Sequence, residues 1–282
     1  MSRSISPPPL TFLGGTALAA ILFAGCTAEP EAGAAATSTA SPASSATTAA
    51  PSPDSQTPAD DVALSLVQDY LAAIQSESYG DAYALLTQES ATLAGSAEQF
   101  AESASSGLVR PDEAAGYLGD EGSLSVGEGP VPGSVLVTAV RDRAADAWLV
   151  RSTGGSVGID DAGVPPTGAN PYEWVNPASG PEDVRDVVPV ADAEPAAIFF
   201  RTPEDAEGPG LVGYPDQLTA YVGTVEVPAS MAAAENQRSW SIPLDAAPPS
   251  AQTQALTVVW EVAPGSGQWR TSTTPLFLAP AS

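Results

Sequence analysis

Residues 137–150, VTAVRDRAADAWLV, are the stretch that decides the fold of the first half of the chain. Apolar, β-branched and aromatic residues gather on both sides of a short polar segment at residues 143–146. This arrangement predicts two antiparallel strands joined by a polar turn. The strands are expected at residues 134–141 and 147–152, and another is expected upstream at residues 123–126.

The residues before these strands carry a helical period. Asp60 and Asp61 are expected to open a helix, because carboxylates suit its positive end. The apolar residues on one face of this predicted helix are Ala63, Leu66, Val67, Tyr70, Leu71 and Ile74. A second short helix is expected after Gly80, and a third from Ser96 onward.

Helices followed by an antiparallel meander predict an α+β region over residues 60–166. Its helical stretch at residues 68–87, QDYLAAIQSESYGDAYALLT, and the hairpin at residues 137–150 resemble the nuclear transport factor two-like superfamily. Many bacterial lipoproteins and the membrane-proximal domains of some penicillin-binding proteins are similar in this way. The resemblance implies a cone of curved sheet around a long first helix. It implies no particular function, because enzymes, ligand binders and spacers all use this fold.

The second half of the chain, residues 170–282, follows a Gly/Pro-rich break at residues 163–171 and is rich in short β runs. The runs expected to be strands are residues 187–190, 196–201, 218–227, 239–244, 253–262 and 268–278. Several strands separated by Pro/Gly turns favour an all-β, sandwich-like domain. The alternative is a diverged copy of the first half, because WEVAPGSGQWRTS at residues 260–272 is similar to VRDRAADAWLVRS at residues 140–152.

The N-terminus has the pattern of a bacterial lipoprotein leader. Arg3 precedes an uncharged apolar run at residues 10–25, which is shorter than the roughly 20 residues that a spanning helix needs. Small residues stand directly before Cys26, the only cysteine, and this resembles a lipobox. The resemblance implies a signal peptide at residues 1–25, cleavage between Gly25 and Cys26, and a lipid on the Cys26 thiol.

The residues after this leader predict a spacer, and the lipid predicts where the protein is located. Residues 26–59 consist mostly of Ala, Ser, Thr and Pro after Cys26 and contain no large apolar side chain, so they are expected to be a disordered tether. The protein is therefore predicted to be anchored by lipid at the extracytoplasmic face of the cell membrane. The alternative is an uncleaved signal anchor in which Cys26 is incidental.

The composition excludes many activities. The chain has 34 acidic and nine basic residues, no His, and a net charge of −25, and all nine basic residues are Arg. Such a charge disfavours nucleic acids and anionic lipid surfaces. Without His or Lys the chain has no Ser-His-Asp triad, imidazole metal ligand, Ser-x-x-Lys nucleophile or Walker lysine. A lipidated Cys26 removes thiol chemistry, so no enzymatic activity and no cofactor are predicted.

Two candidate sites remain. Asp160 and Asp161 lie close to Gly158 and Gly163, and they are the best candidates for calcium, which prefers oxygen ligands. A pocket at the mouth of the cone is the second candidate, and the same aromatic residues would otherwise fill a core. The residues expected there are Tyr70, Tyr83, Tyr117 and Trp148.

The sequence thus predicts a non-enzymatic envelope lipoprotein that binds or positions an unidentified protein or small molecule. One alternative is an acid/base enzyme with a buried carboxyl in the first region, which would need a raised pKa. Another is a calcium-dependent adhesion or interaction domain. A periplasmic-type solute receptor is disfavoured, because such receptors close two larger lobes about a hinge.

Overall fold

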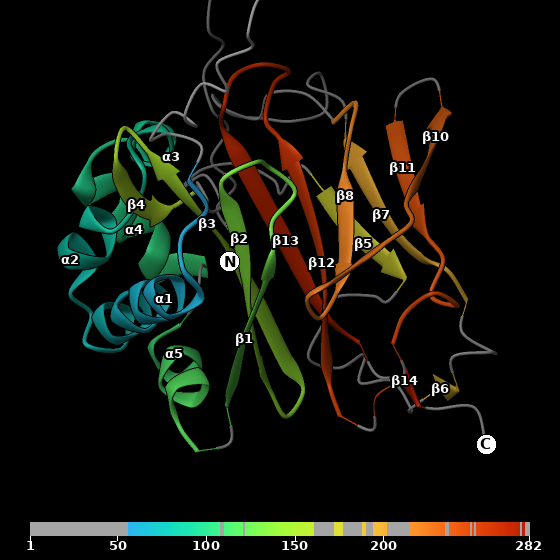
Figure 1. Cartoon of the computed structure of the whole chain (residues 1–282), viewed down its shortest axis with the longest axis horizontal. Coiled ribbons are helices and arrows are strands. Elements are labelled where there is room, and N and C mark those ends of the chain that lie inside the picture. Colours follow the sequence, from blue (N-terminus) through green and yellow to red (C-terminus); the bar gives the residue numbers. More distant parts are fainter. Residues whose placement is uncertain are drawn as a thin grey trace, which may run out of the picture. The chain divides into compact units, whose positions relative to one another are not determined.

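Figure 1 shows the computed structural model, which describes residues 56–107, 110–120, 122–160, 172–176, 188–189, 194–201, 215–234, 237–248, 250, 252–276 and 278–279. All of them belong to one unit, Ala49–Ser282. The predictions for the leader, for Gly25 and Cys26, and for nearly all of the tether concern residues outside this part of the chain. The Gly/Pro break at residues 163–171 lies outside it as well.

The helices come first, and α1 (Asp60–Gln75) buries the predicted stripe except for Leu66, which is half-buried. Next come α2 (Tyr79–Ala84), α3 (Gln88–Ala94), α4 (Ala97–Gly107) and α5 (Pro111–Leu118). The helix predicted from Ser96 onward is α4, and its start is capped, because the Ser96 N–H donates to Gln99 Oε1 at 2.9 Å and Ser96 Oγ accepts the Gln99 N–H at 3.3 Å. Neither α3 nor α5 was predicted, because segments this short carry too little of the helical period.

Four antiparallel strands follow in the order β1-β2-β3-β4. They are β1 (Ser123–Glu128), β2 (Ser134–Arg141), β3 (Ala144–Thr153) and β4 (Ser156–Ile159). The hairpin is tighter than the sequence suggested, because Arg141 already pairs with Ala144 and Asp142 takes a positive φ of 42°. The helices cover one face of this sheet, and Val67, Trp148 and Ile159 belong to the core between them (Figure 1).

The later strands form two four-stranded sheets. One has the order β10-β11-β7-β5, with β5 (Tyr172–Asn176), β7 (Ala196–Arg201), β10 (Ser230–Ala234) and β11 (Gln237–Ile242). The other has the order β13-β12-β8-β9, with β8 (Thr219–Val222), β9 (Val225–Val227), β12 (Gln254–Glu261) and β13 (Trp269–Leu276). Both sheets contribute to one core that includes Phe200, Trp240 and Trp260. A short parallel pair, β6 (Val188–Pro189) with β14 (Leu278–Ala279), completes the strands.

The helix-free face of the first sheet packs against the sheet that contains β12. Leu136, Ala147 and Leu149 meet Tyr221 and Val259 in a third core. Strands β2 and β12 are therefore buried on both faces, and six consecutive residues of each are buried. This double burial explains why β2 reads as a nearly continuous apolar run rather than as strict alternation.

The mixed helix and strand content confirms the predicted α+β class. Within the described segments, no helix is long and apolar enough to cross a membrane. The expected run at residues 218–227 is a hairpin of two strands, β8 and β9, because Gly223 takes a positive φ of 60° between them. Strands β4, β5 and β10 were not predicted, and the predicted domain boundaries stay predictions.

Candidate functional site

A cleft of about 570 Å³ lies where the β1–β2 turn meets the later strands. Its apolar lining residues are Pro130, Pro215, Leu218, Val259, Val262 and Pro264. Its aromatic and polar lining residues are Asp216, Gln217, Thr219, Trp240, Glu261 and Trp269. This volume is within the range of small-molecule and peptide sites in proteins, roughly 300–1,000 Å³.

Strand register brings the lining residues together. Val259 lies opposite Thr219 on β8, and Glu261 lies opposite Trp269 on β13. Val259 and Glu261 are two residues apart on β12, so their side chains leave the same face of the strand. Regular backbone pairing therefore fixes the spacing of these four residues, and such sites are more precise than sites built on loops.

The turn between β12 and β13 closes one side of the cleft. Both oxygens of Glu261 accept backbone N–H groups of this turn, from Gly265 at 2.9 Å and from Gly267 at 2.7 Å. Gly265 and Gly267 have φ values of 75° and 68°, which side chains with a Cβ rarely adopt. The Pro-Gly-Ser-Gly sequence is thus suited to this turn, and Glu261 stabilises it.

Two tryptophans of the cleft have unusual surroundings. The indole N–H groups of Trp240 and Trp269 are both buried, and neither has a hydrogen-bond partner among the residues that the structure describes. By contrast, the indole N–H of Trp174 donates to Ser272 Oγ at 2.9 Å. A buried donor without a partner costs about 1–3 kcal/mol, and both indole nitrogens are closed to solvent in this structure.

A buried ion pair connects the cleft to the helical layer. Arg151 Nε lies 2.7 Å from Asp160 Oδ2, and the Asp160 side chain is fully buried. Asp160 Oδ1 accepts hydrogen bonds from the hydroxyls of Thr87 at 2.7 Å and Ser90 at 3.3 Å. Arg151 also donates to the carbonyl of Gly267 in the β12–β13 turn at 2.9 Å. One guanidinium therefore links the start of α3 to the wall of the cleft.

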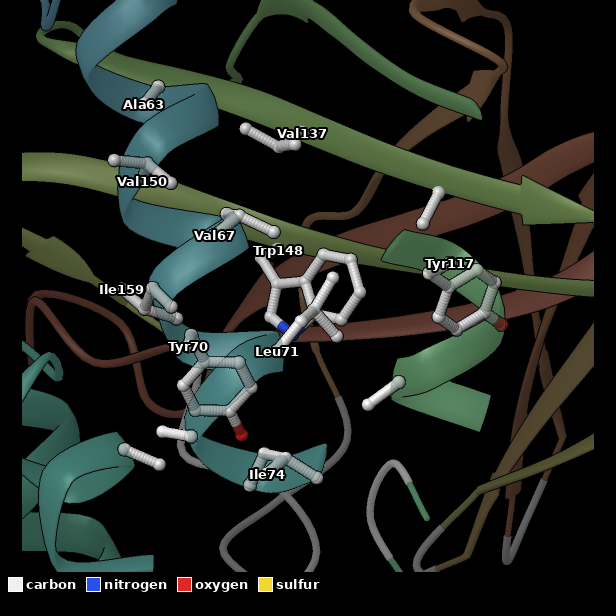
Figure 2. Close-up of a cluster of buried hydrophobic side chains, with 14 of the residues drawn as sticks. Ala63, Val67, Tyr70, Leu71, Ile74, Tyr117, Val137, Trp148, Val150 and Ile159 are labelled. Carbon is white, nitrogen blue, oxygen red and sulfur yellow. The ribbon is translucent and has the colours of Figure 1, made fainter. Parts of the chain in front are cut away.

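Three of the four residues predicted to line a pocket in the first region are packed against one another. Figure 2 shows Tyr70, on α1, and Tyr117, on α5, beside the indole of Trp148, on β3. Each tyrosine ring centroid lies 6.3 Å from that of Trp148 in an edge-to-face arrangement. All three side chains are at most 5 % exposed, and burial raises the pKa of the Tyr117 phenol. The structure thus places them in the core between the helices and the first sheet.

The fourth predicted pocket residue, Tyr83, lies apart from this cluster. Its ring is 5.8 Å from that of Phe100, and its hydroxyl donates to the carbonyl of Gly95 at 2.7 Å. Tyr83 therefore joins α2 to the start of α4. The pocket in the first region stays a prediction, and the cleft described above contains none of its four residues.

Of the calcium candidate, the structure describes only Asp160, because Asp161 lies outside the described residues. Burial raises the pKa of Asp160, while Arg151 and the hydroxyls of Thr87 and Ser90 oppose that rise. Both oxygens of Asp160 are thus engaged by protein groups. In the described ranges, no group of three or more acidic, His or Cys side chains is placed to hold a metal ion.

The cleft was not found from the sequence. The sequence predicted strands at residues 253–262 and 268–278, on the two sides of the turn, but nothing in the pattern linked them to Pro130 or to Trp240. Residues more than one hundred positions apart in the chain form this site. The sequence does contain one relevant signal. Trp260-Glu261 and Gln268-Trp269 stand on the two sides of the turn, so they place polar and indole groups on adjacent strands.

The chain was compared with family models, with curated proteins and with solved structures. No family model, no curated protein and no solved structure matches it.

Proposed function

We propose that this protein is a lipid-anchored envelope protein that binds its ligand without chemical conversion, and that the cleft containing Trp240 and Trp269 is the ligand site. The observation that carries the proposal is the cleft itself, which has a volume of about 570 Å³ and is lined by proline, aliphatic and indole side chains together with a few polar ones. Concave sites of this size with a few placed polar groups are where proteins usually bind ligands.

The surroundings of the cleft support this proposal. Its lining combines prolines and aliphatic side chains with a few polar groups, as binding sites usually do. The lining residues on β8, β12 and β13 are held in register, and Glu261 and Arg151 fix the adjacent turn. A site held in this way loses little conformational entropy when a ligand binds.

We also propose the finer architecture. The first region is an α+β cone of the nuclear transport factor two-like kind, supported by α1 lying against a four-stranded antiparallel sheet. The second region is a β-sandwich, supported by the core that two further four-stranded sheets share. In this arrangement the cone holds the sandwich, and the cleft lies at their junction.

Anchoring through Cys26 gives the first prediction. Replacing Cys26 by Ser is expected to prevent lipid transfer, because a hydroxyl does not replace the thiol that the lipobox presents. The variant should accumulate as unprocessed precursor or leave the membrane fraction. The measurement is detergent partitioning of whole cells together with the intact mass of the protein.

The matched control is Ser45→Cys in the Cys26→Ser background, which restores one thiol at a position without a lipobox. It should behave like Cys26→Ser. The anchoring proposal fails if Cys26→Ser partitions into detergent with the processed mass of the original protein.

Occupation of the cleft in cells gives the second prediction. A photo-reactive p-benzoylphenylalanine at Gln217, an exposed lining residue, is expected to form a covalent adduct of defined mass on irradiation. The control places the same group at Asp69, an exposed residue of α1. Labelling at Gln217 that disappears in a Trp269→Phe background supports the cleft, whereas equal labelling at Gln217 and Asp69, or none at all, contradicts it.

A carboxylate enzyme is the second candidate function. It is favoured by Asp160, a fully buried carboxyl whose pKa burial raises. Against it, Asp160 is engaged by Arg151, Thr87 and Ser90, and it does not line the cleft. A general acid or base must reach its substrate, so the binding function is the better proposal.

A further inference from the structure

The carboxylate of Glu261 is a fixed negative charge in the wall of the cleft. Its two oxygens accept the N–H groups of Gly265 at 2.9 Å and Gly267 at 2.7 Å, which hold it in one position. Among the residues that the structure describes, Glu261 has no cationic partner. Arg151, whose guanidinium reaches the carbonyl of Gly267 on the same turn, is paired with Asp160. The charge of Glu261 is therefore available to a ligand.

The other charged group at the cleft has the same sign. Asp216 also lines it, and no Arg stands among the described lining residues. The net charge of −25 on the whole chain adds to this negative potential. Clefts that carry charges of one sign between apolar walls focus the electric field, because the walls lower the local dielectric constant. The cleft therefore attracts cations and repels anions.

The two indoles of the cleft offer a ligand carbon rather than hydrogen bonds. The Nε1 atoms of Trp240 and Trp269 are closed to solvent, so a ligand can touch only the carbon atoms of these rings. Pro130, Pro215 and Pro264 extend the apolar lining. Indole rings attract cations through their π electrons, most strongly where water is excluded. Such walls suit a cation whose charge is covered by carbon, because it has no N–H group that needs an acceptor.

From these observations we infer that the cleft binds an organic cation of the quaternary ammonium class. Glu261 and Asp216 supply the counter-charge, and the indole carbons contact the methyl groups of the cation. A primary ammonium or a guanidinium fits less well, because its N–H groups need acceptors and each oxygen of Glu261 already accepts an N–H group. This inference rests on the proposed function, because it names the ligand class of the same cleft.

The test is calorimetric titration of the full-length protein, in micelles of an uncharged maltoside detergent, with small probes. Choline carries a trimethylammonium group, 3,3-dimethyl-1-butanol is its neutral isostere, and ethanolamine is the corresponding primary amine. Choline is expected to bind at least about tenfold more tightly than either of the others. Added salt should weaken the binding of choline but not that of the alcohol. Equal binding of choline and the alcohol, or tighter binding of ethanolamine, overturns the inference.

Phosphocholine separates two sources of the same group, a free cation and a lipid headgroup. Its phosphate would lie close to the carboxylates of the cleft, so phosphocholine is expected to bind more weakly than choline. That result supports a free cation as the ligand. Tighter binding of phosphocholine than of choline overturns the inference, because an anion beside the ammonium group would then be favoured.

Substitutions identify the groups that bind the cation. Glu261→Gln and Asp216→Asn should each weaken choline binding about three- to tenfold and leave the neutral alcohol unaffected. Asp216→Asn keeps the test valid if loss of the Glu261 carboxylate distorts the turn. Trp269→Leu, which keeps apolar bulk without π electrons, should weaken choline binding by a similar factor.

The matched control is Asp69→Asn, which removes an exposed carboxylate of α1 outside the cleft lining. It changes the net charge by the same amount as the cleft variants and should leave the affinity for choline unchanged. Unchanged affinity in all three cleft variants, or an equal loss in the control, overturns the inference.

Capture in cells separates this inference from the proposed function. If no probe binds while p-benzoylphenylalanine at Gln217 still captures a molecule in a manner sensitive to Trp269→Phe, the cleft is a ligand site and the cation inference is wrong. If no probe binds and Gln217 captures nothing, the inference and the proposed function are both wrong.

Discussion

Replacing Trp148 by alanine is expected to lower the free energy of unfolding by about 3–5 kcal/mol. Trp148 is 3 % exposed and makes edge-to-face contacts with Tyr70 and Tyr117, so truncation leaves a large cavity between the helices and the first sheet. The two tyrosines come from α1 and α5, and these helices can move into the gap only by losing their packing on β3. Urea unfolding followed by circular dichroism measures the effect.

The control for this substitution is Val62→Ala, which truncates an apolar residue of α1 that is 46 % exposed. It should change stability by less than about 0.5 kcal/mol. If Trp148→Ala also costs less than about 1 kcal/mol, its indole lines open space and does not fill a core. That outcome would favour the predicted pocket in the first region over the filled core described above.

Asp160→Ala is expected to cost a similar amount, about 3–5 kcal/mol, because removing one partner of a buried ion pair leaves the other charge without compensation. The Arg151 side chain is only 14 % exposed, and the hydroxyls of Thr87 and Ser90 would lose their acceptor. The pKa of Asp160 is raised, which shows that burial opposes its charge. The expected loss of stability therefore comes from the unpaired Arg151 charge and the two hydroxyls without an acceptor, rather than from the loss of a strongly favourable ion pair.

Asp112→Ala is the matched control, since Asp112 lies 3.6 Å from Arg110 and both side chains are largely exposed. Exposed ion pairs contribute about 0–1 kcal/mol, so this variant should unfold almost as the original protein does. Asp160→Asn should fall between the two, because it keeps an acceptor for Thr87 while losing the charge. Equal stability of the Asp160→Ala and Asp112→Ala variants would show that the pair does not hold α3 to the sheet.

Much of the fold was predictable from local patterns. The stripe from Ala63 to Ile74 specified α1, the Ser96–Gln99 pair specified the start of α4, and residues 134–141 were predicted as the strand that β2 forms. These signals are local, because each depends on residues within one helix or one strand. The short elements α3, α5 and β4 give no such signal.

The rest depended on contacts between distant segments. Tyr221 and Val259 are buried against Leu136 and Leu149, a pairing that no local pattern encodes. The cleft also depends on distant segments, because Pro130 lines it together with residues more than eighty positions later in the chain. Tyr70 and Tyr117 contact Trp148, whereas Tyr83 contacts Phe100. Whether such aromatic residues enclose space or fill it depends on how closely the helices pack.

The most direct test of the cleft as a ligand site is the indole region of a ¹H–¹⁵N NMR spectrum, recorded with and without the molecule that the photo-reactive group at Gln217 captures. The chain has five tryptophans, so five indole N–H signals are expected, and single Trp→Phe variants assign them. The signals of Trp240 and Trp269, which line the cleft, are expected to shift when this molecule is added, while those of Trp148, Trp174 and Trp260 stay in place. Movement of the Trp148 signal alone, or no movement of the Trp240 and Trp269 signals at saturation, would contradict a ligand site in the cleft.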